Sequence, residues 1–257
     1  MLLTHRIDGE GPSLVLLNGG FMSIAAWDRF VAPLSAQSLV IRCDFRGQLL
    51  TPGPYPDSLD AHAGDVVELL DALGIASAHV AGASFGGEVA MHLAAHFPDR
   101  VNRLTVITAT DRITEKMRRD TREAKRLAEE AAAGRRDAAE LLFRRLFAET
   151  WSARWLARQP PDFLDNRARQ LSMLPTTYFA GAAALLGVLE TIDLTPDLGR
   201  IAAPTLVVGG AQDRVFPLEH SRAIANAIPG ARLEIIPDTG HGLVIERADR
   251  VMELLRT

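Results

Sequence analysis

The stretch Val80-Ala81-Gly82-Ala83-Ser84-Phe85-Gly86-Gly87 joins an apolar run to a run of helix-forming residues. Glycine two residues before Ser84 and two residues after it allows the backbone to fold back on itself between a strand and a helix. Such a turn lifts the serine hydroxyl above the end of the strand. The pattern therefore predicts that Ser84 is a catalytic nucleophile. Its alternative is a glycine-rich turn whose serine only caps the following helix.

Size and charge limit the classes of protein to consider. The chain has 257 residues, 47% of them hydrophobic, which suffices for one α/β domain with a sizeable core. A net charge of −4 gives no case for a nucleic acid or an anionic membrane as partner. Cys43 is the one cysteine, so an internal disulfide is excluded and a reducing compartment fits. Since we find no signal peptide and no apolar segment long enough to cross a bilayer, we expect a cytoplasmic protein.

Strands and helices alternate along most of the chain. Short apolar runs, typical of strands buried on both faces, are followed by helical patterns up to Asp111 and again from about residue 192. This order predicts a mostly parallel sheet with helices on both faces. Residues 112–191 show helical patterns only. We therefore expect a single domain, 1–257, whose core (1–111 and 192–257) carries an inserted helical cap.

Two later loops contain the partners that a nucleophilic serine needs, namely a base and an acid that orients the base. Asp213 follows the strand that ends near Val208, and His241 follows the last strand. Because the carboxyl ends of parallel strands lie at one edge of the sheet, we expect both side chains near Ser84. The sequence thus predicts a Ser84, Asp213 and His241 triad. Asp111 also follows a strand and is the alternative acid.

These segments resemble the capped members of the α/β-hydrolase superfamily, over essentially the whole chain outside the cap. The resemblance implies that Ser84 attacks a carbonyl carbon, that His241 acts as general base and then general acid, and that Asp213 orients His241. It also implies an oxyanion hole formed by the backbone N–H of Phe85 and one N–H from the Gly20-Phe21 loop. It is carried by Leu16-Leu17-Asn18-Gly19-Gly20, Asp44-Phe45-Arg46-Gly47, the Ser84 turn, residues 201–209 and Gly240-His241.

Two positions depart from the family's usual pattern. Asn18 stands where the family usually has histidine. After Gly47 the family continues with His-Gly and a small residue, whereas this chain continues with Gln48-Leu49-Leu50-Thr51. We expect Asn18 to brace its loop and the second departure to change the wall near the pocket entrance. We also expect Asp44 and Arg46 to pair across the turn.

The remaining site residues come from the cap, where Phe147, Trp151 and Tyr178 are candidates for lining an apolar substrate pocket. No metal and no cofactor is expected, because the sequence lacks both metal-ligand spacing and a phosphate-binding loop. The sequence therefore favours a serine hydrolase that cleaves a small to medium, apolar carboxylic ester or lactone through an acyl-enzyme at Ser84. C–C bond hydrolases of ring-cleavage products, cofactor-free haloperoxidases and acyl transferases use the same three residues. A ligand receptor on this fold is the non-enzymatic alternative.

Overall fold

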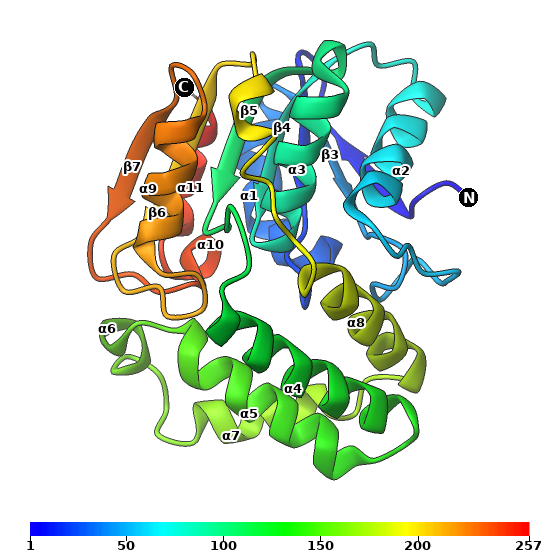
Figure 1. The fold of residues 1–257 in the computed structure, drawn as a ribbon, viewed down its shortest axis with the longest axis vertical. Coiled ribbons are helices and arrows are strands. Elements are labelled where there is room, and N and C mark those ends of the chain that lie inside the picture. Colours follow the sequence, from blue (N-terminus) through cyan, green and yellow to red (C-terminus); the bar gives the residue numbers. More distant parts are fainter. Residues whose placement is uncertain (257) are drawn as a thin grey trace.

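The computed structural model describes residues 1–256, and seven strands of this range form one sheet (Figure 1). The strand order is β1-β3-β2-β4-β5-β6-β7. β1 runs antiparallel to β3, and all other neighbouring strands are parallel, which confirms the predicted mostly parallel sheet. The strands are β1 (His5–Asp8), β2 (Ser13–Leu17), β3 (Leu39–Cys43), β4 (Ala78–Ala83), β5 (Val101–Ile107), β6 (Thr205–Gly210) and β7 (Arg232–Ile236).

Helices cover both faces of the sheet because alternate strand residues point to opposite sides. In β2, Val15 belongs to an apolar cluster with residues of α2, α3 and α9, whereas Leu16 belongs to a second cluster with residues of α1 and α11. These two apolar layers form the core of the protein. The covering helices are α1 (Asp28–Ser35), α2 (Leu59–Ala72), α3 (Phe85–His96), α9 (Leu218–Ala227), α10 (Leu243–Glu246) and α11 (Ala248–Arg256), with short 3-10 turns at Ile24–Trp27, Pro98–Arg100 and Leu198–Arg200.

The helices between β5 and β6 form a separate layer, here called the helical block, which lies below the sheet in Figure 1. Leu127, Phe143 and Phe179 belong to its own apolar cluster. Within the described residues no single helix is long and apolar enough to span a membrane; α7 and α8 reach that length only together, across a bend of 104°. The block comprises α4 (Glu115–Ala132), α5 (Arg136–Thr150), α6 (Ala153–Leu156), α7 (Phe163–Leu171) and α8 (Thr176–Leu189).

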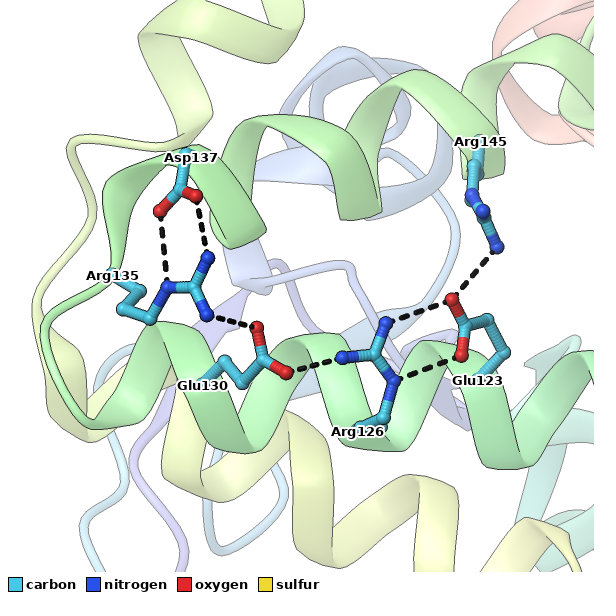
Figure 2. A network of polar contacts seen from close by, with 6 residues as sticks. All are labelled: Glu123, Arg126, Glu130, Arg135, Asp137 and Arg145. Atoms are coloured by element: carbon cyan, nitrogen blue, oxygen red, sulfur yellow. Dashed lines mark hydrogen bonds and ion pairs between the residues drawn. The ribbon is translucent and has the colours of Figure 1, made fainter.

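An exposed chain of ion pairs fastens α4 to α5 on the outside of the block (Figure 2). Arg126 contacts both Glu123 and Glu130, Arg135 joins Glu130 at 3.1 Å, and Arg145 of α5 joins Glu123 at 3.0 Å. Exposed pairs of this kind each contribute little to stability, roughly 0–1 kcal/mol. The charged face of α4 is thus a solvated surface.

One contact between the block and the core lies along α8. Gly181 lies against Gly47 so closely that a Cβ atom added at position 181 would sit 1.8 Å from the Gly47 carbonyl oxygen. Nearby, the Tyr55 hydroxyl donates to the Thr177 carbonyl oxygen at 3.3 Å. The loop after β3 therefore touches the block backbone to backbone, and only glycine fits there.

Candidate active site

Ser84 occupies a strained turn between β4 and α3. Its φ of 51° and ψ of −124° lie outside the regions that non-glycine residues favour. A Cβ on Gly82 would lie 2.0 Å from the Gly86 carbonyl oxygen, and one on Gly86 would lie 2.5 Å from the Leu17 carbonyl oxygen. The glycines are thus required by backbone crowding. The Ser84 side chain makes no capping hydrogen bond to α3, so the alternative of a mere helix cap does not describe this turn.

The structure brings Ser84, His241 and Asp213 into one hydrogen-bonded chain. The Ser84 Oγ lies 3.0 Å from His241 Nε2, and His241 Nδ1 lies 2.9 Å from Asp213 Oδ2. A carboxylate only accepts, so His241 Nδ1 carries the hydrogen and Nε2 is free to accept from the serine hydroxyl. The His241 side chain is 12% exposed and that of Asp213 only 2%. The carboxylate is therefore shielded from solvent, whereas the imidazole is partly accessible.

Local contacts orient the Asp213 carboxylate and the His241 imidazole. The second Asp213 oxygen, Oδ1, accepts from the N–H groups of Val215 and Phe216, each at 2.9 Å. The Phe216 ring meets the His241 imidazole edge to face, with ring centroids 5.2 Å apart. Both carboxylate oxygens are therefore engaged, and the imidazole plane is held.

Asp111 faces away from this chain and pairs with His220 instead. Its Oδ1 lies 2.6 Å from His220 Nδ1, and both side chains are buried. The Thr110 hydroxyl lies 3.0 Å from the same His220 nitrogen. Asp111 thus anchors α9 to the end of β5, and the acid facing His241 is Asp213. Sequence reasoning missed this pair because 109 residues separate its members.

The residues predicted for the oxyanion hole lie beside Ser84. A Cβ on Gly19 would lie 3.4 Å from the Ser84 Cβ, and one on Gly20 would lie 3.9 Å from the Phe85 Cβ. Phe85 is the first residue of α3, so its N–H has no acceptor within the helix. Phe21 points to the helical block, where its ring meets that of Phe143 at 6.0 Å. The backbone N–H groups of Gly20 and Phe85 thus stay the first candidates for the oxyanion hole, with that of Phe21 as the second choice.

Asn18 and Gln48, the two departures from the family pattern, contact each other in a buried polar cluster. Asn18 Nδ2 lies 3.0 Å from Gln48 Oε1 and also donates to the Cys43 carbonyl oxygen and to Asp44 Oδ1, both at 2.9 Å. Asn18 Oδ1 accepts from the Trp27 indole N–H at 2.8 Å. The expected bracing role of Asn18 is confirmed. Nothing in the sequence signalled that Gln48 is its partner.

The expected pairing of Asp44 with Arg46 is wrong. Arg46 Nε donates to Asp65 Oδ2 on α2 at 2.6 Å. Asp44 is fully buried and accepts backbone N–H groups from Ile24 at 2.7 Å and Leu50 at 3.0 Å. Burial raises the pKa of the Asp44 carboxyl, and these N–H donors oppose the rise. The carboxylate thus has three donors, Asn18, Ile24 and Leu50, and the Arg46 guanidinium binds Asp65 instead.

The cap aromatic residues lie in the buried cluster of the block, next to the loops of the site. The Trp151 ring packs against Gly242, directly after His241, and stacks on Trp155 with centroids 4.3 Å apart. The Tyr178 hydroxyl donates to the Phe21 carbonyl oxygen at 3.3 Å. Phe147 packs against the rings of Phe143 and Trp151, with centroids 5.8 and 6.3 Å away. Trp151 and Tyr178 thus contact loops of the candidate site, whereas Phe147 contacts other aromatic rings of the block.

Hydrogen bonds join the carboxyl end of α5 to the loop that carries Asp213 and to the loop that carries His241. Arg214 donates to the Ala148 carbonyl oxygen at 2.5 Å, and the Gly242 N–H donates to the Thr150 carbonyl oxygen at 2.9 Å. Glu246 accepts from the Ser152 N–H at 2.9 Å and from the Gly240 N–H at 3.2 Å. The positions of Asp213 and His241 are therefore tied to the block.

His62 is buried behind the nucleophile turn. Its ring meets Phe45 and Phe85 edge to face, at 5.3 Å and 5.1 Å, and neither ring nitrogen has a hydrogen-bond partner. Burial, aided by the positive charge of Arg46, lowers the pKa of His62 to about 3. The imidazole is neutral and serves as an aromatic packing element. Residues 1–256 contain no group of three or more His, Cys, Asp or Glu side chains that could hold a metal ion.

Comparison with known proteins agrees with this architecture. A family model described as alpha/beta hydrolase fold matches residues 12–248. A Caulobacter sp. (strain K31) protein provisionally named carbamate hydrolase RutD is 30% identical over 95% of this chain and 90% of its own. The 3-oxoadipate enol-lactonase 2 of Acinetobacter baylyi is 28% identical over 88% of this chain and 81% of its own. The crystal structure of an enol-lactonase from Burkholderia xenovorans LB400 superposes with a TM-score of 0.85 at 30% identity, covering 99% of this chain and 95% of that one.

Proposed function

We propose that this chain, which belongs to the alpha/beta hydrolase fold family, is a serine hydrolase that cleaves a small to medium, apolar carboxylic ester or lactone. The observation that carries the proposal is the unbroken chain from the Ser84 hydroxyl through His241 to the Asp213 carboxylate, with contacts of 3.0 and 2.9 Å. The names of the relatives, which include enol-lactonases, support an ester or lactone as the substrate class.

The first half of the reaction forms an acyl-enzyme. Ser84 Oγ attacks the carbonyl carbon while His241 Nε2 takes its proton, and the carbonyl π electrons move to the oxygen. The backbone N–H groups of Phe85 and Gly20 donate to this oxyanion, a contact that stabilises charge present only in the transition state and the intermediate. The intermediate collapses, the C–O bond to the alcohol breaks, and His241 gives its proton to the leaving oxygen. Asp213 stabilises the imidazolium that exists between these steps.

The second half repeats the chemistry with water. His241 takes a proton from a water molecule, which attacks the acyl carbon, and the bond to Ser84 Oγ breaks as the serine regains a proton. For an ester the alcohol has already left, whereas for a lactone the ring-opened hydroxyl stays on the acyl chain. The apolar cluster of the block, which includes Trp151 and Tyr178, borders the site and favours an acyl group without charge.

Labelling with a fluorophosphonate tests the nucleophile. The native protein is expected to label, Ser84→Ala is expected to lose the label, and Asp213→Asn is expected to lose about 10⁴-fold in kcat because the imidazole no longer holds the right tautomer. Turnover is then compared on p-nitrophenyl acetate, butyrate and octanoate, a γ-lactone, an aryl carbamate and a vinylogous 1,5-diketone. Absence of labelling in the native protein, or equal labelling of Ser84→Ala, refutes the enzyme proposal and leaves a receptor on this fold. Turnover of the diketone alone assigns the site to C–C bond hydrolysis.

A further inference from the structure

We propose that Gln48 is a positioning residue that holds the Gly19-Gly20 peptide so that the Gly20 N–H faces the substrate oxygen. Gln48 Nε2 donates to the Gly19 carbonyl oxygen at 2.8 Å, and the Met22 N–H donates to the same oxygen at 3.0 Å. The Gly19-Gly20 bond is trans, since the cis bond of the described chain is Gly53-Pro54. In a planar trans peptide the N–H points opposite to the C=O. Fixing the Gly19 oxygen on the Gln48 side therefore turns the Gly20 N–H the other way.

The orientation of the Gln48 side-chain amide is fixed by neighbouring N–H groups that can donate but cannot accept. The Phe45 backbone N–H can only donate, and it lies 2.9 Å from Gln48 Oε1. The Trp27 indole N–H fixes Asn18 in the same way, so that Asn18 Nδ2 also faces Gln48 Oε1. With Oε1 engaged as acceptor, the NH₂ group of Gln48 is left for the Gly19 oxygen. The order of donation runs from Trp27 through Asn18 and Gln48 to Gly19.

A pair of glycines needs such a constraint. Glycine adopts conformations on both sides of φ = 0 with little cost, so the orientation of the Gly19-Gly20 peptide depends on the two donors to its oxygen. The Met22 N–H belongs to the same loop, whereas Gln48 Nε2 holds the oxygen from a neighbouring loop. A rotated peptide would present its carbonyl oxygen, in place of its N–H, to the developing oxyanion. Gln48 is 3% exposed, so water does not compete for the hydrogen bonds of its amide. The Asn18 amide contacts the Gln48 amide, and the Gln48 amide holds the Gly19 oxygen.

The inference rests on the proposed hydrolase function, because it concerns the oxyanion of that reaction. Gln48→Glu is the sharpest test, since it keeps the shape of the side chain and replaces the donating NH₂ with an acceptor. At a pH high enough to ionise the introduced carboxyl, we expect kcat to fall by about 10²-fold, the loss typical of one oxyanion donor, with little change in KM. Fluorophosphonate labelling of Ser84 should persist at a reduced rate.

The pH profile of Gln48→Glu separates positioning from general damage. Burial and the neighbouring Asp44 carboxylate disfavour a charge at position 48, and a protonated glutamic acid can again donate to the Gly19 oxygen. The ratio of kcat for Gln48→Glu to kcat for the native enzyme should therefore rise as the pH falls. Gln48→Met, which removes the donor without adding a charge, should lose kcat with a ratio independent of pH.

Thr51→Val provides the matched control in the same loop. Thr51 is as buried as Gln48, and its hydroxyl donates to the Asp44 carbonyl oxygen at 2.9 Å, but it does not touch Gly19. Its kcat should equal that of the native enzyme even if its melting temperature falls. Native-like kcat in both Gln48 variants, or an equal loss in Thr51→Val, overturns the inference. Activity that survives Ser84→Ala refutes the proposed function instead, whatever the Gln48 variants do.

Discussion

Gly181 of α8 sets how closely the helical block approaches the core, and its replacement by alanine is expected to destabilise the protein. A Cβ at this position would lie 1.8 Å from the Gly47 carbonyl oxygen and 2.5 Å from the Gly47 Cα. Gly187, which lies two turns further along the same helix, is the matched control. A Cβ there would meet only the end of the Lys125 side chain, at 3.6 Å.

The magnitudes follow from these distances. Ordinary contact requires roughly 3.4–4 Å between a carbon and its neighbours, so α8 has to move away from Gly47 by well over 1 Å to admit one methyl group. The Gly47 N–H donates to the Thr51 carbonyl oxygen at 2.8 Å, and this bond limits how far the Gly47 backbone can move aside. Overpacking costs about 1–3 kcal/mol, which exceeds the gain of roughly 1 kcal/mol from alanine in a helix. Gly187→Ala should show only the stabilisation that alanine brings in a helix, without the cost of overpacking.

Thermal unfolding measures both variants under the same conditions. For a chain of this length, 1 kcal/mol corresponds to about 2–4 °C in Tm. Gly181→Ala should melt below the native protein, and Gly187→Ala should melt at or slightly above it. KM should rise in Gly181→Ala only, because α8 also carries Tyr178, whose hydroxyl binds the Phe21 carbonyl oxygen. An increase in Tm for Gly181→Ala equal to that of Gly187→Ala would refute the backbone contact.

Two further perturbations test buried polar groups. The folded-state pKa of His62 is about 3, below its ordinary value of 6.5, so the unfolded chain binds more protons between these limits. Unfolding free energy should therefore fall as the pH drops from about 6.5 towards 3, and His62→Phe should lessen that fall in urea titrations; an unchanged slope would contradict a neutral buried imidazole. Glu246→Gln leaves one acceptor oxygen for the donors of Ser152 and Gly240, so stability should fall by about 1–3 kcal/mol together with kcat. Glu253→Gln, which loses only the exposed pair with Arg250, should change both by little.

Much of this architecture is readable from the sequence because it depends on local patterns. Short apolar runs gave the strands, and the rule that parallel strands end at one edge placed Asp213 and His241 beside Ser84. Residues 112–191 show helical patterns only, and the five helices α4 to α8 lie in this range. The crowding around Ser84 follows from the spacing of Gly82 and Gly86, which is visible without coordinates.

The contacts that the sequence did not predict share one physical cause. Each polar side chain has several possible partners, and the actual partner is distant in sequence. Arg46 and Asp44 are close in sequence, but the carboxylate that Arg46 binds belongs to Asp65 on α2, 19 residues away. Asn18 and Gln48 were each visible as departures, and only the fold shows that they touch across 30 residues. Buried donors and acceptors pair by geometry that the tertiary structure sets, so sequence spacing carries no information about them.

The contacts divide the candidate triad between two layers of the molecule. Ser84 is held by the sheet alone, through its N–H to the Ile107 carbonyl oxygen at 2.9 Å and the crowded glycines of its turn. The loops of Asp213 and His241 follow strands of the same sheet. Hydrogen bonds of Arg214, Gly242 and Glu246 also join these loops to the end of α5. The 3.0 Å contact between Ser84 and His241 is thus the place where the two layers meet. A change in the block that shifts the end of α5 acts on the alignment of base and nucleophile even when it touches neither. For the proposed hydrolase we therefore expect substitutions in the helical block to change kcat as well as the choice of substrate.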